Sequence, residues 1–215
     1  MAATRSPKRP RPTTVLLVRH GRTATTGSVL PGRAPGLHLS AEGEAQADAA
    51  AARLAPLSPA AVYASPMERT RETAAPISRA AGLRTRTARG LIECDFGSWT
   101  GRRLADLRRT SQWADVQRAP STFRFPDGES FAEMQQRIWA QLGELAAAHP
   151  GERVVAVSHA DPIKAAVAMA AGVHLDSFQR LVVSPCSVSA LLLGAGAPIV
   201  LCVNSTGDLS ELAVS

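Results

Sequence analysis

Arginine and histidine side chains follow three apolar segments of the chain, each at the point where a strand would end. In open α/β sheets, ligands bind at the carboxyl ends of the strands, so neighbouring parallel strands would bring these side chains to one pocket. Guanidinium groups and imidazoles together suit the capture of a phosphate group, with a histidine as nucleophile. The apolar segments are residues 14–18, 61–64 and 153–157, and the side chains that follow them are Arg19, His20, Arg69 and His159.

Helix start signals come directly after two of these segments. Ser65 and Glu68 have the spacing of a capping box, and Pro66 fits the first helical position. Ser158 followed by Asp161 repeats the pattern after the last segment. Helix N-termini attract anions, so this arrangement adds to the phosphate-binding chemistry.

A candidate general acid lies in the glycine-rich, aromatic stretch at residues 90–101. Glu93 follows a short apolar run there, and partial desolvation by Phe96 and Trp99 would raise its pKa, as a general acid needs. Nearby arginines would lower the pKa, so its value is not predicted. Asp95 is the alternative acid in this stretch.

Strand and helix patterns alternate along the chain, which predicts an α/β fold with a mostly parallel central sheet covered on both faces. The apolar run at residues 188–203 is interrupted by Gly194, Gly196 and Pro198, and we interpret it as two buried strands joined by a turn. We expect further strands at residues 14–18, 61–64, 83–87 and 153–157, and helices at residues 40–55, 66–81, 102–118 with a break near Thr110, 130–148 and 161–171.

Composition indicates one globular domain in a chain of 215 residues, of which 45% are hydrophobic. The net charge is +6, and Arg5, Lys8, Arg9 and Arg11 at the N-terminus account for much of it. We therefore expect a disordered, basic, proline-rich tail at residues 1–13 and a folded domain at residues 14–215. The tail could touch nucleic acid or anionic lipid, but we expect neither nucleic acid nor a membrane as partner.

The cysteines Cys94, Cys186 and Cys202 have no metal-ligand spacing. Their odd number and apolar neighbours favour reduced thiols. The N-terminus also lacks the long apolar core of a secretion signal. Together these features predict a cytoplasmic protein.

Five segments, in this order, resemble the histidine phosphatase superfamily, and most closely the branch of cofactor-dependent phosphoglycerate mutases and their phosphatase relatives. The resemblance covers about residues 14–203. It implies a three-layer α/β/α sandwich and a phosphohistidine intermediate, with no metal and no other cofactor. The segments are Arg19-His20-Gly21-Arg22-Thr23, residues 65–74, Glu93 with residues 97–101, residues 126–130, and Val157-Ser158-His159-Ala160.

The resemblance also implies roles for individual residues. His20 is the expected nucleophile and Glu93 the proton donor, while Arg19, Arg69 and His159 hold the phosphate. Thr26 stands where the family usually has an asparagine that binds phosphate, and its hydroxyl has a shorter reach. The expected substrate-binding residues are Arg19, Thr26, Gly32, Arg69, Ala160, Arg102 and Arg103.

The resulting hypothesis is a metal-independent phosphatase that hydrolyses a small phosphorylated metabolite. A phosphoglycerate mutase is the first alternative, although the chain lacks the Trp-Arg-Arg-type segment of the mutases, which Arg102 and Arg103 could only partly imitate. A non-catalytic module that senses a phosphorylated ligand is the alternative from another class. The sequence leaves the oligomeric state open, with a homodimer as one alternative.

Overall fold

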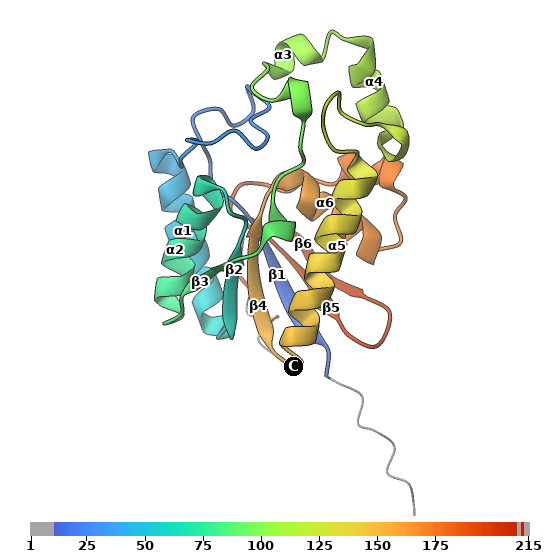
Figure 1. Ribbon diagram of the computed structural model, residues 1–215. Helices are drawn as coiled ribbons and strands as arrows, with labels where there is room; N and C mark the ends of the chain where they lie inside the picture. The colour runs from blue at the N-terminus through green and yellow to red at the C-terminus, as the bar shows by residue number, and fades with distance from the viewer. Residues whose placement is uncertain (1–10, 210–211, 213–215) are drawn as a thin grey trace, which may run out of the picture.

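A six-stranded sheet with the order β3-β2-β4-β1-β5-β6 forms the centre of the protein (Figure 1). The computed structural model describes residues 11–209 and residue 212. Strands β1 to β4 are parallel, whereas β5 pairs antiparallel with β1 and β6 pairs antiparallel with β5. The strands are β1 (Thr13–Arg19), β2 (Ala61–Ala64), β3 (Thr85–Thr87), β4 (Arg153–Ser158), β5 (Val188–Leu193) and β6 (Ile199–Ser205). The prediction of a mostly parallel sheet is confirmed.

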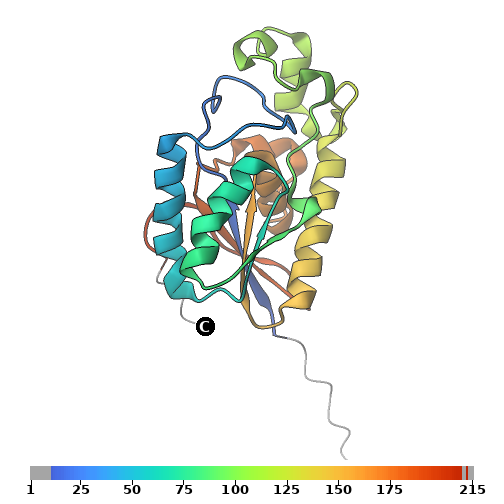
Figure 2. The same cartoon turned by 60° about the vertical axis from the view of Figure 1, so that its left-hand side comes forward.

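Helices cover both faces of this sheet, so the expected three layers are present (Figures 1 and 2). Alternate residues of β1 serve the two faces: Val15 and Leu17 pack in the cluster that contains α5 and α6, and Leu16 and Val18 pack in the cluster that contains α1 and α2. The helices are α1 (Ala41–Leu54), α2 (Glu68–Ala80), α3 (Leu104–Leu107), α4 (Ser111–Arg118), α5 (Phe131–Ala148) and α6 (Ala160–Ala170).

The central strands β1 and β4 are buried along nearly their whole length because both of their faces are covered, and their middle residues are apolar. Their register pairs Arg19 with Ser158. The residues that follow, His20 and His159, therefore leave adjacent strands at the same edge of the sheet.

Helices α3 and α4 lie above this edge as a small cap (Figure 1). The expected helix at residues 102–118 is broken, as predicted, and α4 begins after Thr110. A separate aromatic cluster packs beneath the cap, and Phe123 and Phe125 belong to its buried part. The aromatic side chains of this cluster are Phe96, Trp99, Trp113, Phe123, Phe125, Phe131 and Phe178.

Some local expectations were wrong. Strand β6 is an edge strand rather than a buried one, and Ile199, Leu201 and Val203 expose 53%, 41% and 38% of their surface. Thr13 is the first residue of β1 and is buried. Its hydroxyl is satisfied there by the carbonyl oxygens of Ala146 and His149. The folded domain thus includes Thr13. Residues 1–10 of the expected tail lie outside the described residues.

Within the described part of the chain, none of the helices combines the length and the apolar character needed to cross a membrane.

Candidate active site

The turn after β1 fixes the backbone around His20. The His20 amide donates to the Ser158 carbonyl oxygen of β4 at 3.0 Å, and the Gly21 amide donates to the Thr73 hydroxyl of α2 at 3.0 Å. The His20 ring is bonded through Nδ1 to the Gly21 carbonyl oxygen at 2.8 Å. Because a carbonyl can only accept, Nδ1 carries the proton, and Nε2 keeps the lone pair that a nucleophile needs.

Two glycines allow this turn to pack against the start of α1. A Cβ atom on Gly21 would lie 2.5 Å from the Gly43 carbonyl oxygen, and a Cβ atom on Gly43 would overlap the Arg22 carbonyl oxygen. The backbones of the turn and of α1 are therefore in direct contact. Ser40 caps α1, as predicted, by accepting a hydrogen bond from the Gly43 amide.

His159 lies fully buried between two side chains that come from the segment after β2. Its Nε2 is 2.9 Å from the Ser65 hydroxyl, and its Nδ1 is 3.2 Å from Nη2 of Arg69. Since a guanidinium only donates, Nδ1 accepts and Nε2 carries the proton. The ring centroids of His20 and His159 are 5.2 Å apart. His159 is therefore a neutral imidazole next to the proposed nucleophile.

The expected capping roles of Ser65 and Ser158 were wrong for the same reason. Helix α2 begins at Glu68 without a side-chain cap, because the Ser65 hydroxyl is directed to His159. Helix α6 begins at Ala160 after His159, and the Ser158 hydroxyl donates to the Leu91 carbonyl oxygen instead. The Ser65 hydroxyl thus helps to orient His159, and the Ser158 hydroxyl binds the backbone two residues before Glu93, instead of capping helices.

Arg69 is fully buried and only partly hydrogen-bonded. Its Nη2 donates to the Gly32 carbonyl oxygen at 2.8 Å and to His159, whereas Nε and Nη1 have no partner among the described residues. Arg19 donates through Nη1 to the Val183 carbonyl oxygen at 2.7 Å, and its Nε likewise has no partner there. Buried donors without an acceptor are costly, which is a reason to expect an anion in this site.

The Glu93 carboxyl lies beside this group of cations. Its Oε1 accepts from the Cys94 amide at 2.9 Å, and its Oε2 is 3.9 Å from Nδ1 of His159. Burial raises the pKa of Glu93 to about 7, and the charge of Asp161 on α6 adds to this shift, while Arg69 and Arg19 oppose it. Such a carboxyl can hold a proton near neutral pH and release it to a leaving group.

Burial acts in the opposite direction on the two histidines. Burial, with the Arg69 and Arg19 charges, lowers the pKa of His20 to about 3. The pKa of His159 also falls well below its usual value, because of burial first and of Arg69 second. Both rings are therefore neutral in the free protein.

The other predicted residues lie around this group in different ways. Gly32 contributes its carbonyl oxygen to Arg69, and Ala160 is the first residue of α6. Thr26 uses its hydroxyl within its own loop, where it accepts from the Thr23 amide at 2.9 Å. Arg102 and Arg103 are exposed, and their backbone pairs with the segment at residues 28–30. The structure therefore brings together Arg19, His20, Arg69, Glu93 and His159. Thr26 bonds within its own loop instead, and Arg102 and Arg103 pair with residues 29 and 30.

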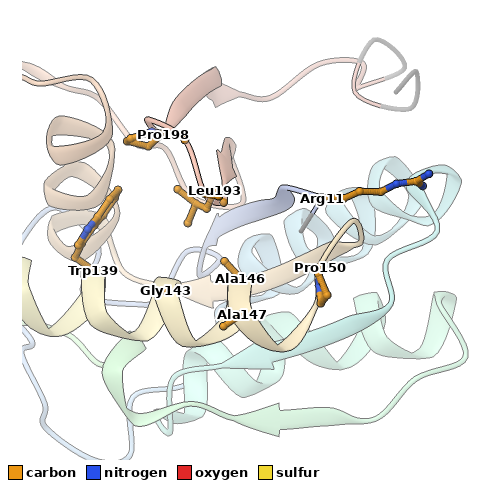
Figure 3. A pocket seen from close by; sticks show the side chains of 11 residues that line it. Arg11, Trp139, Gly143, Ala146, Ala147, Pro150, Leu193 and Pro198 are labelled. Carbon is orange, nitrogen blue, oxygen red and sulfur yellow. The ribbon is translucent and has the colours of Figure 1, made fainter. Parts of the chain in front are cut away.

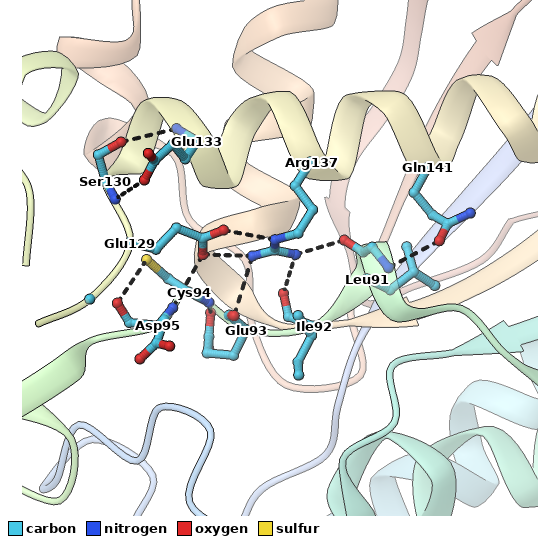
Figure 4. A network of polar contacts seen from close by, with 12 residues as sticks. Leu91, Ile92, Glu93, Cys94, Asp95, Glu129, Ser130, Glu133, Arg137 and Gln141 are labelled. Atoms are coloured by element: carbon cyan, nitrogen blue, oxygen red, sulfur yellow. Dashed lines mark hydrogen bonds and ion pairs between the residues drawn. The ribbon is translucent and has the colours of Figure 1, made fainter.

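Sequence reasoning missed a polar network behind Glu93. Figure 4 shows the pair of Glu129 with Arg137 in it, and Arg33 joins the network by donating to the same carboxylate. One signal was available: Arg137 interrupts the apolar stripe of α5 between the buried residues Met134 and Ile138. A charged side chain next to a buried stripe needs a partner of opposite charge. Glu129, in the segment at residues 126–130, is that partner.

Another cavity, of about 500 Å³, lies at the opposite end of the sheet, next to the end of β5 (Figure 3). It is lined mostly by apolar and small residues of α5 and of the turn after β5, among them Trp139, Ala146, Leu193 and Pro198. The Arg11 side chain extends away from Ala146 and Leu193 in the figure. This cavity has none of the buried donors that surround His20.

Comparisons with known proteins agree with this geometry. A family model described as "Histidine phosphatase superfamily (branch 1)" matches residues 15–206. An uncharacterized protein of Mycobacterium tuberculosis is 37% identical over 72% of this chain and 76% of its own length. Phosphoserine phosphatase 1 of Hydrogenobacter thermophilus is 29% identical over 93% and 96%, and a probable phosphoglycerate mutase of Salmonella arizonae is 30% identical over 81% and 82%.

Solved structures share the fold. The protein described as mycobacterial hydrolase 1 superimposes with a TM-score of 0.83 at 25% identity, over 92% of this chain and 100% of that one. A mycobacterial glucosyl-3-phosphoglycerate phosphatase gives a TM-score of 0.81 at 25% identity, over 91% and 100%. The α/β fold expected from the sequence is confirmed.

Proposed function

Because this chain belongs to the histidine phosphatase superfamily, we propose that it hydrolyses phosphate monoesters of small metabolites through a phosphohistidine on His20. The observation that supports this most is Arg69, whose guanidinium is fully buried beside both histidines with two nitrogens lacking a partner among the described residues. A phosphate dianion supplies the acceptors and the negative charge that those donors require.

The first step follows from the protonation states. Neutral His20 attacks phosphorus through Nε2, the bond from phosphorus to the leaving oxygen breaks, and Glu93 gives its proton to that oxygen. Arg19 and Arg69 stabilise the charge on the equatorial oxygens. The bound dianion also favours protonation of His159, which adds a further donor. His20 Nδ1–H, bonded to the Gly21 carbonyl, keeps the ring in the required tautomer.

The second step regenerates the protein. Glu93, now ionised, accepts a proton from water as the water attacks the phosphohistidine, and the bond from nitrogen to phosphorus breaks. Inorganic phosphate then leaves. One carboxyl thus serves as acid and as base, for which a pKa near neutrality is suitable; burial holds the pKa of Glu93 at about 7.

The substrate class we propose is a phosphorylated small metabolite, as the names of the relatives suggest: phosphoserine phosphatase and glucosyl-3-phosphoglycerate phosphatase. The proposed reaction uses no metal and no cofactor, and its proposed place is the cytoplasm. The protonated carboxyl and the guanidinium groups suffice for the charge changes in both steps.

A mutase is the second candidate, favoured by the 30% identity to a probable phosphoglycerate mutase. A mutase returns the phosphoryl group to another hydroxyl, whereas a phosphatase gives it to water. The ratio of free phosphate to 2-phosphoglycerate formed from 3-phosphoglycerate distinguishes the two. We expect free phosphate as the main product.

The direct test is hydrolysis of p-nitrophenyl phosphate in EDTA, together with acid-labile phosphate trapping by rapid quench and mass spectrometry of the peptide that contains His20. We expect turnover in EDTA and a phosphoryl group on His20. A folded protein that binds phosphate without turnover of any monoester would instead identify a phosphate-sensing module.

A further inference from the structure

Glu93 lies on a stretch of chain without regular secondary structure. The stretch connects a 3-10 turn at Arg89–Leu91 with a second at Gly97–Trp99. Residues 93–96 are neither helix nor strand. Glu93, Cys94 and Phe96 are buried, so their backbone groups need partners from elsewhere in the protein.

The side chains of Arg137, seen in Figure 4, and of Arg33 supply partners for the carbonyl oxygens of this stretch. Arg137 on α5 donates through Nη1 to the carbonyl oxygens of Gly90 and Ile92, each at 2.8 Å. The Glu93 carbonyl oxygen accepts from Nη2 of Arg137 at 3.3 Å and from Nε of Arg33 at 2.9 Å. Two cations therefore fix the peptide that carries the proposed acid.

Glu129 binds both arginines and the backbone at once. Its carboxylate accepts from Nε and Nη2 of Arg137, each at 2.8 Å, and from Nη2 of Arg33 at 3.0 Å. It also accepts from the Asp95 amide at 3.2 Å, while the Glu129 amide donates to the Asp95 carbonyl oxygen at 2.9 Å. The side chain is only 14% exposed. Glu129 thus contacts both arginines and the backbone of Asp95.

Glu129 is the acidic partner that Arg33 and Arg137 share, and both arginines also donate to the Glu93 carbonyl oxygen. Among the described residues, removal of the Glu129 charge would leave Arg33 with Asp95 as its acidic partner and Arg137 without one. Uncompensated cations favour the ionised form of a nearby carboxyl. The groups that face Glu93 or its segment are Arg19 at the end of β1, Arg33 in the loop that follows, Arg69 on α2, Cys94 and Asp95 beside it, Glu129 just before α5, Arg137 on α5, and His159 and Asp161 at the start of α6.

We propose that Glu129 is a positioning residue for the acid step: by pairing with Arg33 and Arg137 it holds the Glu93 peptide in place and offsets two cations that would otherwise strip the proton from Glu93. The catalytic part of this proposal rests on the proposed phosphatase function. The electrostatic part is a property of the folded chain and is measurable without turnover. Burial raises the pKa of Glu93 to about 7, in a structure where Arg33 and Arg137 are both paired with Glu129.

The experiment measures the pKa of Glu93 from the NMR chemical shift of its carboxyl carbon as a function of pH. It compares wild type with one variant that removes a negative charge and one that removes a positive charge. In Glu129→Gln, which removes the counter-ion but keeps the size, we expect the pKa of Glu93 to fall by about one unit. In Arg33→Met, which removes a cation, we expect it to rise. The matched control is Glu133→Gln, which changes an exposed glutamate that binds Arg124 and the Ser130 amide; we expect no shift there.

Kinetics provide the second readout. The alkaline limb of kcat/KM should move with the pKa of Glu93, downward in Glu129→Gln and upward in Arg33→Met. Glu129→Gln should also lose more activity towards phenyl phosphate than towards p-nitrophenyl phosphate, because the poorer leaving group depends more on the proton. A purely structural role would lower activity towards both equally and leave the limb in place.

Each outcome decides between the ideas. An unshifted Glu93 titration in both variants overturns the positioning proposal, whether or not the protein is an active phosphatase. Shifts of the expected signs in a protein that hydrolyses no monoester support the electrostatic role and overturn the phosphatase function instead. Should Glu129→Gln fail to fold, Arg33→Met on its partly exposed loop gives the same test with the opposite sign.

Discussion

The two histidines and Glu93 meet in one site but are held there by different means. His20 follows β1 and His159 follows β4, and the register of those adjacent strands brings them together through the backbone. Glu93 lies on an irregular segment whose backbone is fixed by Arg33 and Arg137. Strand ends give the nucleophile a rigid position. Side-chain pairs give the acid a position that depends on charge.

This difference predicts different sensitivities. The positions of His20 and His159 should depend on hydrogen-bonding atoms and little on nearby charges. The reason is that backbone hydrogen bonds between strands hold these two residues. The position and the protonation of Glu93 should depend on pH and on nearby charges, because ion pairs hold its segment in place. Variants that change one side alone can test this contrast.

The largest effect should come from His20→Ala, which breaks the strand-held side. Loss of the nucleophile removes the covalent step, and we expect kcat to fall by at least about 10³-fold, as for other nucleophile deletions. His174→Ala is the control, because His174 is exposed and bonds only near the start of its own turn. Steady-state kinetics and thermal melting of both variants measure this. Turnover by His20→Ala at the wild-type rate would refute the proposed role of His20.

Glu93→Gln should break the charge-held side with a somewhat smaller loss. Removal of a general acid costs roughly 10²–10⁴-fold, and we expect the lower end for p-nitrophenyl phosphate and the upper end for alkyl phosphates. Wild-type kcat/KM should decline above about pH 7, because burial raises the pKa of Glu93 to about 7. No acid limb from His20 is expected above pH 4, since burial lowers the pKa of His20 to about 3.

Asp95→Asn is the comparison for that prediction, because Asp95 is the alternative acid and also an ion-pair partner of Arg33. We expect the alkaline limb to survive in Asp95→Asn and to vanish in Glu93→Gln. The reverse pattern would transfer the acid role to Asp95.

The same carboxyl should cost the protein stability at high pH. Its pKa is raised from 4.5 to about 7, so between these values the folded state binds more protons than the unfolded state, and stability falls as pH rises. At pH 8 the cost is about 3 kcal/mol. Glu93→Gln has no such cost. We expect urea denaturation to show the variant gaining stability relative to wild type from pH 4 to pH 8, and a constant difference would contradict the shifted pKa.

The smallest effect should come from Ser130→Ala, which weakens the start of α5 without touching the network. Ser130 accepts from the Glu133 amide and completes a capping box, so its loss should cost about 1 kcal/mol of stability. Denaturant midpoints measure the loss. The alkaline limb of kcat/KM should stay where it is, and a moved limb would mean that α5 and the acid are more tightly coupled than the ion pairs imply.

The sequence predicted the elements that depend on local pattern. Apolar runs located β1, β2 and β4, and the helices expected at residues 40–55 and 130–148 correspond to α1 and α5. The convergence of His20, Arg69 and His159 followed from the parallel order of those strands. These features depend on hydrophobic periodicity and on the rule that ligands bind at the carboxyl ends of parallel strands. Both can be applied to a sequence without a structure.

Other features depended on contacts between distant residues. Ser65 matched a capping pattern, but His159, far along the chain, uses its hydroxyl instead. The exposure of β6 depended on its place at the edge of the sheet, since an apolar run alone does not distinguish a central strand from an edge strand. The pairing of Glu129 with Arg33 joins residues from separate loops, and no local spacing indicates it.

Close backbone contact is common to both halves of the site, and it limits how the protein can evolve. Gly21 and Gly43 touch beside His20, and Gly97 and Gly128 touch beside the Glu93 segment, where a Cβ on Gly128 would lie 2.5 Å from the Asp95 carbonyl oxygen. In a library randomised at these four positions and selected for growth, glycine should be the residue recovered. Substitutions in the cap of α3 and α4 can then change substrate preference, while the two glycine contacts keep the backbone around His20 and Glu93 unchanged.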